Sequence, residues 1–226
     1  MWNTEELNMK HILIYGDSNT FGCNPKASDG KDPNENLRYE PENRWPYILR
    51  KSLSPDYEVI DEGLPGRTAA LDEPFKPFRK GIDTFVAIAQ SHYPVDLLIF
   101  LLGVNDLKFA FHETDVQKSM EALLQVALNP YNWDRQPVPE ILLIAPPPLA
   151  EPISGSCFYG MFREEHVEFS QKVAPLYKEL ADAYHCHFMD AGAFIEASPI
   201  DCVHFTREGH HVLAEEVEKK IKEILE

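Results

Sequence analysis

The sequence has little positive charge and no long apolar run. Lys and Arg number 21 against 37 Asp and Glu among 226 residues, which gives a formal net charge of −16. Nucleic-acid binding needs clustered basic residues, because phosphate contacts supply most of the affinity, and no such cluster is visible. No stretch has the length and apolar character of a membrane span. We therefore expect a small-molecule substrate, neutral or cationic, and neither nucleic acid nor a membrane as a partner.

Cysteines are also few, and they are far apart in the sequence. The four of them, Cys23, Cys157, Cys186 and Cys202, are widely separated and form no C-x-x-C motif. This pattern predicts free thiols rather than disulfides or a metal site. The first residues lack the cationic start and apolar run of a signal peptide. We expect a cytoplasmic protein, with Met9, directly before the first apolar stretch, as a candidate start.

Apolar β-rich runs alternate with amphipathic helical patterns along the chain. Strands are predicted at residues 11–15, 57–60, 95–102, 140–145 and 187–189. Helices are predicted at residues 44–53, 82–91, 114–128, 164–184 and 206–225, the third and the last capped by Thr114 and Thr206. Such alternation predicts one doubly wound α/β domain over residues 1–226, with a mainly parallel sheet covered on both faces.

In this class of fold, ligands bind beyond the carboxyl ends of the strands. Residues 16–20 (GDSNT) follow the first strand and place Ser18 where a helix or loop begins. Ser18 is either a nucleophile or a plain helix cap. Residues 61–68 (DEGLPGRT) follow the second strand, where Gly66 either presents an unobstructed N–H to an oxyanion or only makes a turn.

Two further segments complete the set of polar candidates. Asn105 follows the third strand, and its amide either donates to an oxyanion or caps a loop. Asp201 and His204 precede the last helix, either as an orienting acid and its base or as surface residues. Taken together the segments favour catalysis: Ser18, His204 and Asp201 as a triad, and Ser18, Gly66 and Asn105 as oxyanion donors. The G-x-S-x-G motif of common α/β hydrolases is absent.

These segments resemble the four motif blocks of the SGNH (GDSL-type) hydrolase superfamily. Residues 145–149 (APPPL) and 204–206 (HFT) extend the resemblance to its arylesterase/acyltransferase subgroup. Asn19 stands where the name-giving motif has Leu, Phe21 where the subgroup tends to have Trp, and Gly66 where it tends to have Ala.

The resemblance implies a three-layer α/β/α fold with a flavodoxin-like, mainly parallel five-stranded sheet and no cofactor or metal. It also implies hydrolysis of small short-chain esters, of the acetyl or aryl type, through an acyl-enzyme, often in homo-oligomers. Acyl transfer to alcohols or peroxide and carbohydrate O-deacetylation are alternatives that use the same triad. A non-catalytic binding domain of the same fold is a further alternative.

Some other features are predicted to be structural. His185 and His187, at the start of the fifth strand, are expected on one face of it without a metal role. His210 and its neighbour are expected on a solvated helix face. Arg67 is expected to pair with an acidic side chain or to touch substrate.

Overall fold

The computed structural model describes residues 9–32 and 34–226, so the expectations about residues 1–8 lie outside the described part. Five strands form one sheet: β1 (Lys10–Gly16), β2 (Tyr57–Gly63), β3 (Leu97–Leu101), β4 (Glu140–Ala145) and β5 (His187–Asp190). Their order is β2-β1-β3-β4-β5 and every neighbouring pair is parallel. This is the flavodoxin-like order, and it confirms the predicted fold class.

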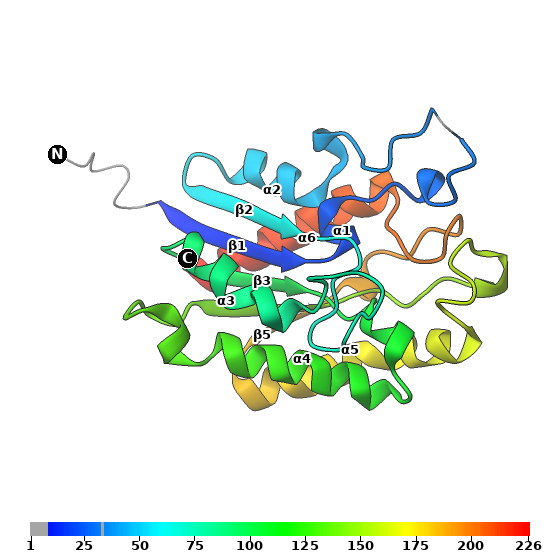
Figure 1. The fold of residues 1–226 in the computed structure, drawn as a ribbon. Helices are drawn as coiled ribbons and strands as arrows, with labels where there is room; N and C mark the ends of the chain where they lie inside the picture. Colours follow the sequence, from blue (N-terminus) through cyan, green and yellow to red (C-terminus); the bar gives the residue numbers. More distant parts are fainter. Residues whose placement is uncertain (1–8, 33) are drawn as a thin grey trace.

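Helices cover both faces of the sheet (Figure 1). On one face lie α2 (Trp45–Leu53) and α6 (Arg207–Leu225); on the other lie α3 (Gly81–Ser91), α4 (Glu113–Ala127) and α5 (Glu164–Tyr184). The central strand β3 shows why both layers are needed. Leu97, Ile99 and Leu101 pack with α2 and α6, whereas Leu98 and Phe100 pack with the other layer. Alternate side chains point to opposite faces, so a fully apolar strand buries both.

Short helices occupy the connections. They are α1 (Ser18–Phe21) and the 3-10 turns η1 (Pro25–Ala27), η2 (Pro41–Asn43), η3 (Asp106–Phe109), η4 (Pro130–Trp133), η5 (Ile153–Gly155) and η6 (Ala191–Ala193). α1 follows β1 directly, at the edge toward which all the strand arrows point (Figure 1). The strand order reverses between β1 and β3, so the carboxyl ends of these two strands are the expected ligand site.

Two predicted helix starts have different outcomes. Thr206 caps α6, and its hydroxyl accepts the N–H of Gly209 at 3.0 Å. The predicted cap Thr114 is wrong, because α4 begins one residue earlier and His112 is its cap. The Asp115 carboxylate accepts the backbone N–H of His112 at 3.0 Å, and the Asp115 N–H donates to the His112 carbonyl at 3.0 Å.

Two expectations about histidines are also wrong. His185 ends α5 in a left-handed conformation (φ 55°) and lies before β5, so it shares no strand face with His187. His210 is fully buried between the rings of Tyr39 and Phe205, not on a solvated face.

The described part of the chain holds no group of three or more potential metal ligands, and its four cysteines are free. None of the helices within residues 9–32 and 34–226 has the length and apolar character needed to cross a membrane.

Candidate active site

Ser18 is the first residue of α1, at the carboxyl end of β1. The cap of this helix is Asp17, whose carboxylate accepts the N–H of Asn19 at 2.9 Å. The alternative interpretation of Ser18 as the helix cap is therefore wrong. Gly16 makes the sharp turn into α1 possible, since a Cβ there would lie 2.0 Å from Thr20 Oγ1. The serine hydroxyl is left free to face another segment.

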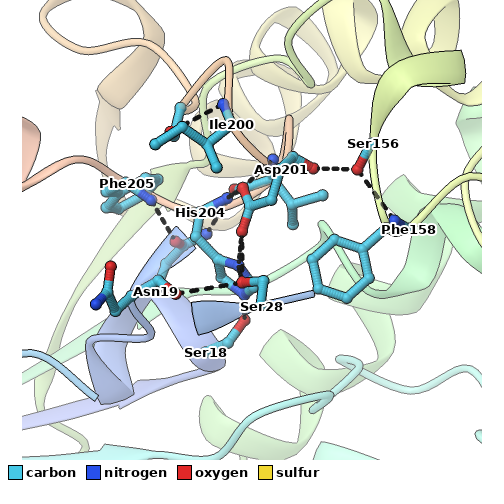
Figure 2. A network of polar contacts seen from close by, with 12 residues as sticks. Ser18, Asn19, Ser28, Ser156, Phe158, Ile200, Asp201, His204 and Phe205 are labelled. Carbon is cyan, nitrogen blue, oxygen red and sulfur yellow. Dashed lines mark hydrogen bonds and ion pairs between the residues drawn. The ribbon is translucent and has the colours of Figure 1, made fainter. Parts of the chain in front are cut away.

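That segment carries His204 and Asp201 (Figure 2). Ser18 Oγ lies 2.9 Å from His204 Nε2, and His204 Nδ1 lies 2.6 Å from Asp201 Oδ2. All three side chains are buried, with 4%, 5% and 0% exposure respectively for Ser18, His204 and Asp201. The chain of contacts has the order in which a base takes the proton of a hydroxyl while an acid orients the base.

The Asp201 carboxylate is saturated with donors. Its Oδ1 accepts the backbone N–H groups of Val203 and His204, both at 3.0 Å. Its Oδ2 accepts the hydroxyl of Ser28 at 2.7 Å as well as the imidazole. Burial alone would raise the pKa of Asp201, but these hydrogen bonds and the neighbouring His204 hold it below its ordinary value. Asp201 therefore stays ionised beside the imidazole.

The contact with Asp201 raises the pKa of His204. Burial would lower the pKa of His204, but the hydrogen bond and charge of Asp201, with a contribution from Cys23, raise it above its ordinary value. The neutral imidazole is the form that accepts a proton. It becomes dominant only as the pH rises above this raised pKa.

The three predicted oxyanion donors, Ser18, Gly66 and Asn105, line one pocket. Gly66 has a φ of 86°, a left-handed conformation that favours glycine, and it lines the same pocket as Ser18 and Asn105. Within residues 9–32 and 34–226, neither the N–H of Ser18 nor that of Gly66 has a hydrogen-bond acceptor. Both donors are available to a bound anion.

The amide of Asn105 is held in one orientation. Lys108 Nζ donates to Asn105 Oδ1 at 2.7 Å, and Asn105 Nδ2 donates to the carbonyl of Arg67 at 3.1 Å and, in a longer contact, to Asp17 Oδ2 at 3.4 Å. An ammonium group can only donate, so the contact requires the amide oxygen to face Lys108 and turns the NH₂ group the other way. The contact of Lys108 with Asn105 was not predicted. The sequence does contain a signal for it, because Lys108 follows Asn105 by three residues, which is one turn of η3.

Buried charges brace the loops around these donors. Burial raises the pKa of Asp17 and of Asp106 to about 6 each. Asp106 accepts the N–H of Ala69 at 2.9 Å and the hydroxyl of Ser119. Arg67 was expected to pair with an acid or touch substrate. It instead lies buried and donates to the carbonyls of Gly16 and Glu62, which ties the ends of β1 and β2 together.

Asn19 and Ser28 are functional positions that the sequence did not reveal. Asn19 Oδ1 accepts the N–H of Phe205 at 3.1 Å, and its Nδ2 donates to the carbonyl of Val203 at 3.4 Å. The residue after the serine thus clamps the segment that carries His204. Ser28 follows η1 directly, and its hydroxyl donates to Asp201 Oδ2 (Figure 2).

Residues 153–162 also contact the segment that carries Asp201 and His204 and form part of the pocket wall. Ser156 Oγ donates to the carbonyl of Asp201 at 2.5 Å and accepts the N–H of Phe158 at 3.0 Å. The Phe158 ring lies edge to face against His204, with 5.5 Å between centroids (Figure 2). The pocket that results has a volume of about 460 Å³ and contains Ser18, Gly66, Asn105 and His204. This volume suits a small organic substrate.

The comparisons with known proteins agree with this geometry. The model of the GDSL-like Lipase/Acylhydrolase family matches residues 14–212. A carbohydrate acetylesterase family member from Sinorhizobium meliloti is 36% identical, with a TM-score of 0.86 over 96% of this chain and 99% of that one. The aryl esterase of M. smegmatis is 32% identical, with a TM-score of 0.86 over 96% of this chain and 100% of that one. These similarities confirm the resemblance predicted from the sequence.

A more distant structure shares the fold. A member of the lipolytic protein G-D-S-L family from Veillonella parvula is 14% identical, with a TM-score of 0.61 over 93% of this chain and 97% of that one. Among curated proteins, none matches the chain.

Proposed function

This chain belongs to the GDSL-like lipase/acylhydrolase family and is a carboxylic ester hydrolase, and on that premise we propose that Ser18 is its nucleophile. His204 is the general base and Asp201 orients it. The observation that carries the proposal is the unbroken contact chain from Ser18 Oγ through His204 to Asp201 Oδ2, at 2.9 and 2.6 Å. Small short-chain esters are the substrates that fit the pocket.

Acylation begins when neutral His204 Nε2 takes the hydroxyl proton of Ser18. The Ser18 oxygen then attacks the ester carbonyl, and the carbonyl oxygen becomes an oxyanion. The N–H groups of Ser18 and Gly66 and the Nδ2 of Asn105 are the donors for this oxyanion. When the intermediate collapses, the C–O bond to the alcohol breaks and His204 returns the proton to the leaving oxygen. An ester of Ser18 remains.

Deacylation repeats these steps with water. His204 takes a proton from water, the hydroxide attacks the acyl carbon, and the same three donors hold the second oxyanion. Collapse releases the carboxylic acid and returns the proton to Ser18 Oγ. Ionised Asp201 stabilises the imidazolium formed in both halves. Lys108 keeps the Asn105 amide turned so that its NH₂ group, not its oxygen, faces the reacting carbonyl.

Two alternatives use the same acyl-enzyme. An alcohol, sugar or peroxide in place of water gives acyl transfer, and an acetylated sugar as substrate gives carbohydrate O-deacetylation. The second has a specific observation in its favour, because a relative at 36% identity bears the name carbohydrate acetylesterase. Aryl acetates and acetylated sugars, compared with and without an alcohol acceptor, separate the three activities by their products.

The test of the nucleophile is the Ser18→Ala variant. Loss of p-nitrophenyl acetate turnover, with an unchanged circular-dichroism spectrum, is expected, because Ser18 is the one hydroxyl among the described residues that contacts His204 Nε2. Ser91→Ala is the matched control, since Ser91 is exposed at the end of α3 and its hydroxyl donates to the carbonyl of Ile88, outside the pocket lining. Wild-type turnover by Ser18→Ala would overturn the assignment.

We also propose a cytoplasmic homo-oligomer. The four free thiols support a reducing compartment. Exposed aromatic side chains support an interface, and they are Phe75, Phe78 and Phe111, with 85%, 78% and 85% exposure. Light scattering coupled to gel filtration tests the second point, and a monomer at micromolar concentration contradicts it.

A further inference from the structure

The lining of the catalytic pocket is positively charged, although the chain as a whole is negatively charged. Its lining includes the cationic side chains of Arg38, Lys76 and Lys108, and no Asp or Glu from the described residues. The chain as a whole has 37 acidic and 21 basic residues. An average surface of this protein would therefore present more carboxylates than cations, and the pocket does the opposite.

Lys108 lies next to the reacting groups. Its Nζ donates to Asn105 Oδ1 at 2.7 Å, and the Nδ2 of the same amide is a proposed oxyanion donor. It also lies 5.3 Å from the centroid of the Phe162 ring, which is part of the pocket wall. An ammonium group has three donors. The Asn105 contact uses one of them, and the others remain for a ligand.

The carboxylates closest to Lys108 are occupied elsewhere. Asp17 and Asp106 are buried and accept the backbone N–H groups of Asn19 and Ala69, and Asp17 also accepts the Asn105 amide at 3.4 Å. Glu73 also acts on Lys108 through its charge, but it accepts the N–H of Phe75 and does not line the pocket. None of these carboxylates faces a molecule bound in the pocket.

Arg38 and Lys76 add positive charge farther out. Arg38 Nε donates to the carbonyl of Phe21 at 2.7 Å, and the guanidinium lies over the Phe21 ring at 4.1 Å. Its acidic neighbour Asp61 lies 3.7 Å away and is held more closely by Arg50, at 2.6 Å. Lys76 is exposed and forms no ion pair with any described residue. Lys76 is therefore free to act on a ligand, and Arg38 adds positive charge while it shares Asp61 with Arg50.

We propose, resting on the ester hydrolase function above, that the preferred substrates are esters that carry a carboxylate a few atoms from the scissile carbonyl. Lys108 and Lys76 attract the carboxylate, while Phe158, Met161 and Phe162 contact the apolar remainder. Cationic walls with low-dielectric surroundings concentrate an anionic ligand and repel a cationic one. The substrate charge is thus the reverse of the one that the net charge of the chain favours.

Matched ester pairs test this proposal. One pair is 3-acetoxybenzoate and its methyl ester, with the charge on the alcohol side; the other is monomethyl glutarate and methyl butyrate, with the charge on the acyl side. Rates are divided by the hydroxide-catalysed rate of each ester. In at least one pair, kcat/KM for the carboxylate is expected to exceed that of the neutral ester about 5-fold. About 0.5 M salt is expected to reduce this preference.

A charge series at Lys76 tests which side chain is responsible. Lys76→Ala is expected to lower the ratio of carboxylate to neutral turnover about 3-fold, and Lys76→Glu about 10-fold. Lys51→Ala is the matched control, because Lys51 is an exposed lysine on α2 outside the pocket lining. It removes the same net charge and is expected to keep the wild-type ratio.

Three results would overturn the proposal. The first is a wild-type enzyme that hydrolyses the neutral member of both pairs as well as, or better than, the carboxylate; ester hydrolysis itself would then stand. The second is a carboxylate preference that neither salt nor Lys76→Glu reduces. The third is no hydrolysis of any of the four esters, which would overturn the proposed function together with this inference.

Discussion

The active site has two halves that are built differently. In the sheet half, Ser18, Gly66 and Asn105 follow β1, β2 and β3 by a few residues each. The parallel register aligns the ends of these strands, since Gly16 lies opposite both Gly63 and Leu101. The loop half consists of residues 22–32, 34–43 and 153–162, which contact the site or line its pocket through Ser28, Arg38 and Phe158. The sheet half supplies the proposed nucleophile and oxyanion donors, and the loop half supplies walls of the pocket and a hydrogen bond to Asp201. His204 and Asp201 lie between them, on the segment before α6.

If this comparison holds, the largest effect is expected in the sheet half. Asn105→Ala removes a donor whose hydrogen bond strengthens as the oxyanion forms, and kcat for p-nitrophenyl acetate is expected to fall about 100- to 1,000-fold with little change in KM. Steady-state kinetics measure both constants. A rise in KM at constant kcat would instead assign Asn105 to substrate binding.

The pH profile tests the charge coupling between Asp201 and His204, which the segment before α6 brings to the sheet half. Asp201 raises the pKa of His204 above its ordinary value of 6.5, and the neutral imidazole is the active base. Activity is therefore present above the raised pKa and is lost as the pH falls through it. The acidic limb of kcat/KM is expected above pH 6.5. A limb well below that value would contradict the coupling to Asp201.

A smaller effect is expected from the loop half. Ser28→Ala removes a donor from Asp201 Oδ2, the same oxygen that accepts from His204, and kcat at neutral pH is expected to fall about 10-fold. The charge left on Oδ2 then holds the imidazole proton more tightly, so the acidic limb moves to higher pH. Ser28→Thr keeps the hydroxyl and is the control. An unmoved limb would reduce Ser28 to a packing residue.

The smallest change in rate is expected at Asn19, which joins the segment of Ser18 to the segment of His204 by two hydrogen bonds. Asn19→Leu restores the residue of the name-giving motif but removes the partners of the Phe205 N–H and the Val203 carbonyl. Stability is expected to fall by about 2 kcal/mol, because buried polar groups lose their hydrogen bonds. Thermal denaturation measures this loss, with exposed Asn36 replaced by Ala as control. An unchanged melting temperature would show that the clamp contributes nothing.

The sequence predicted the sheet half much better than the loop half. Residues after parallel strands must meet at one end of the sheet, so the sequence could predict that Ser18, Gly66 and Asn105 lie in one pocket. Ser28 could not, because its contact with Asp201 depends on how a long irregular segment crosses the molecule. His210 was a different kind of error. It lies three, four and seven residues before the buried positions 213, 214 and 217 of α6, so helical periodicity already places it on the buried face.

One measurement tests the central claim most directly, because both halves bring a serine to His204. Ser18 Oγ lies 2.9 Å from Nε2, and Ser28 Oγ lies 3.4 Å from Nδ1. Wild-type protein is treated with an organophosphonate that traps serine nucleophiles, and the modified residue is located by peptide mass spectrometry. The account predicts a single adduct on Ser18 that parallels the loss of activity. An adduct on Ser28, or full inactivation with Ser18 unmodified, would contradict it.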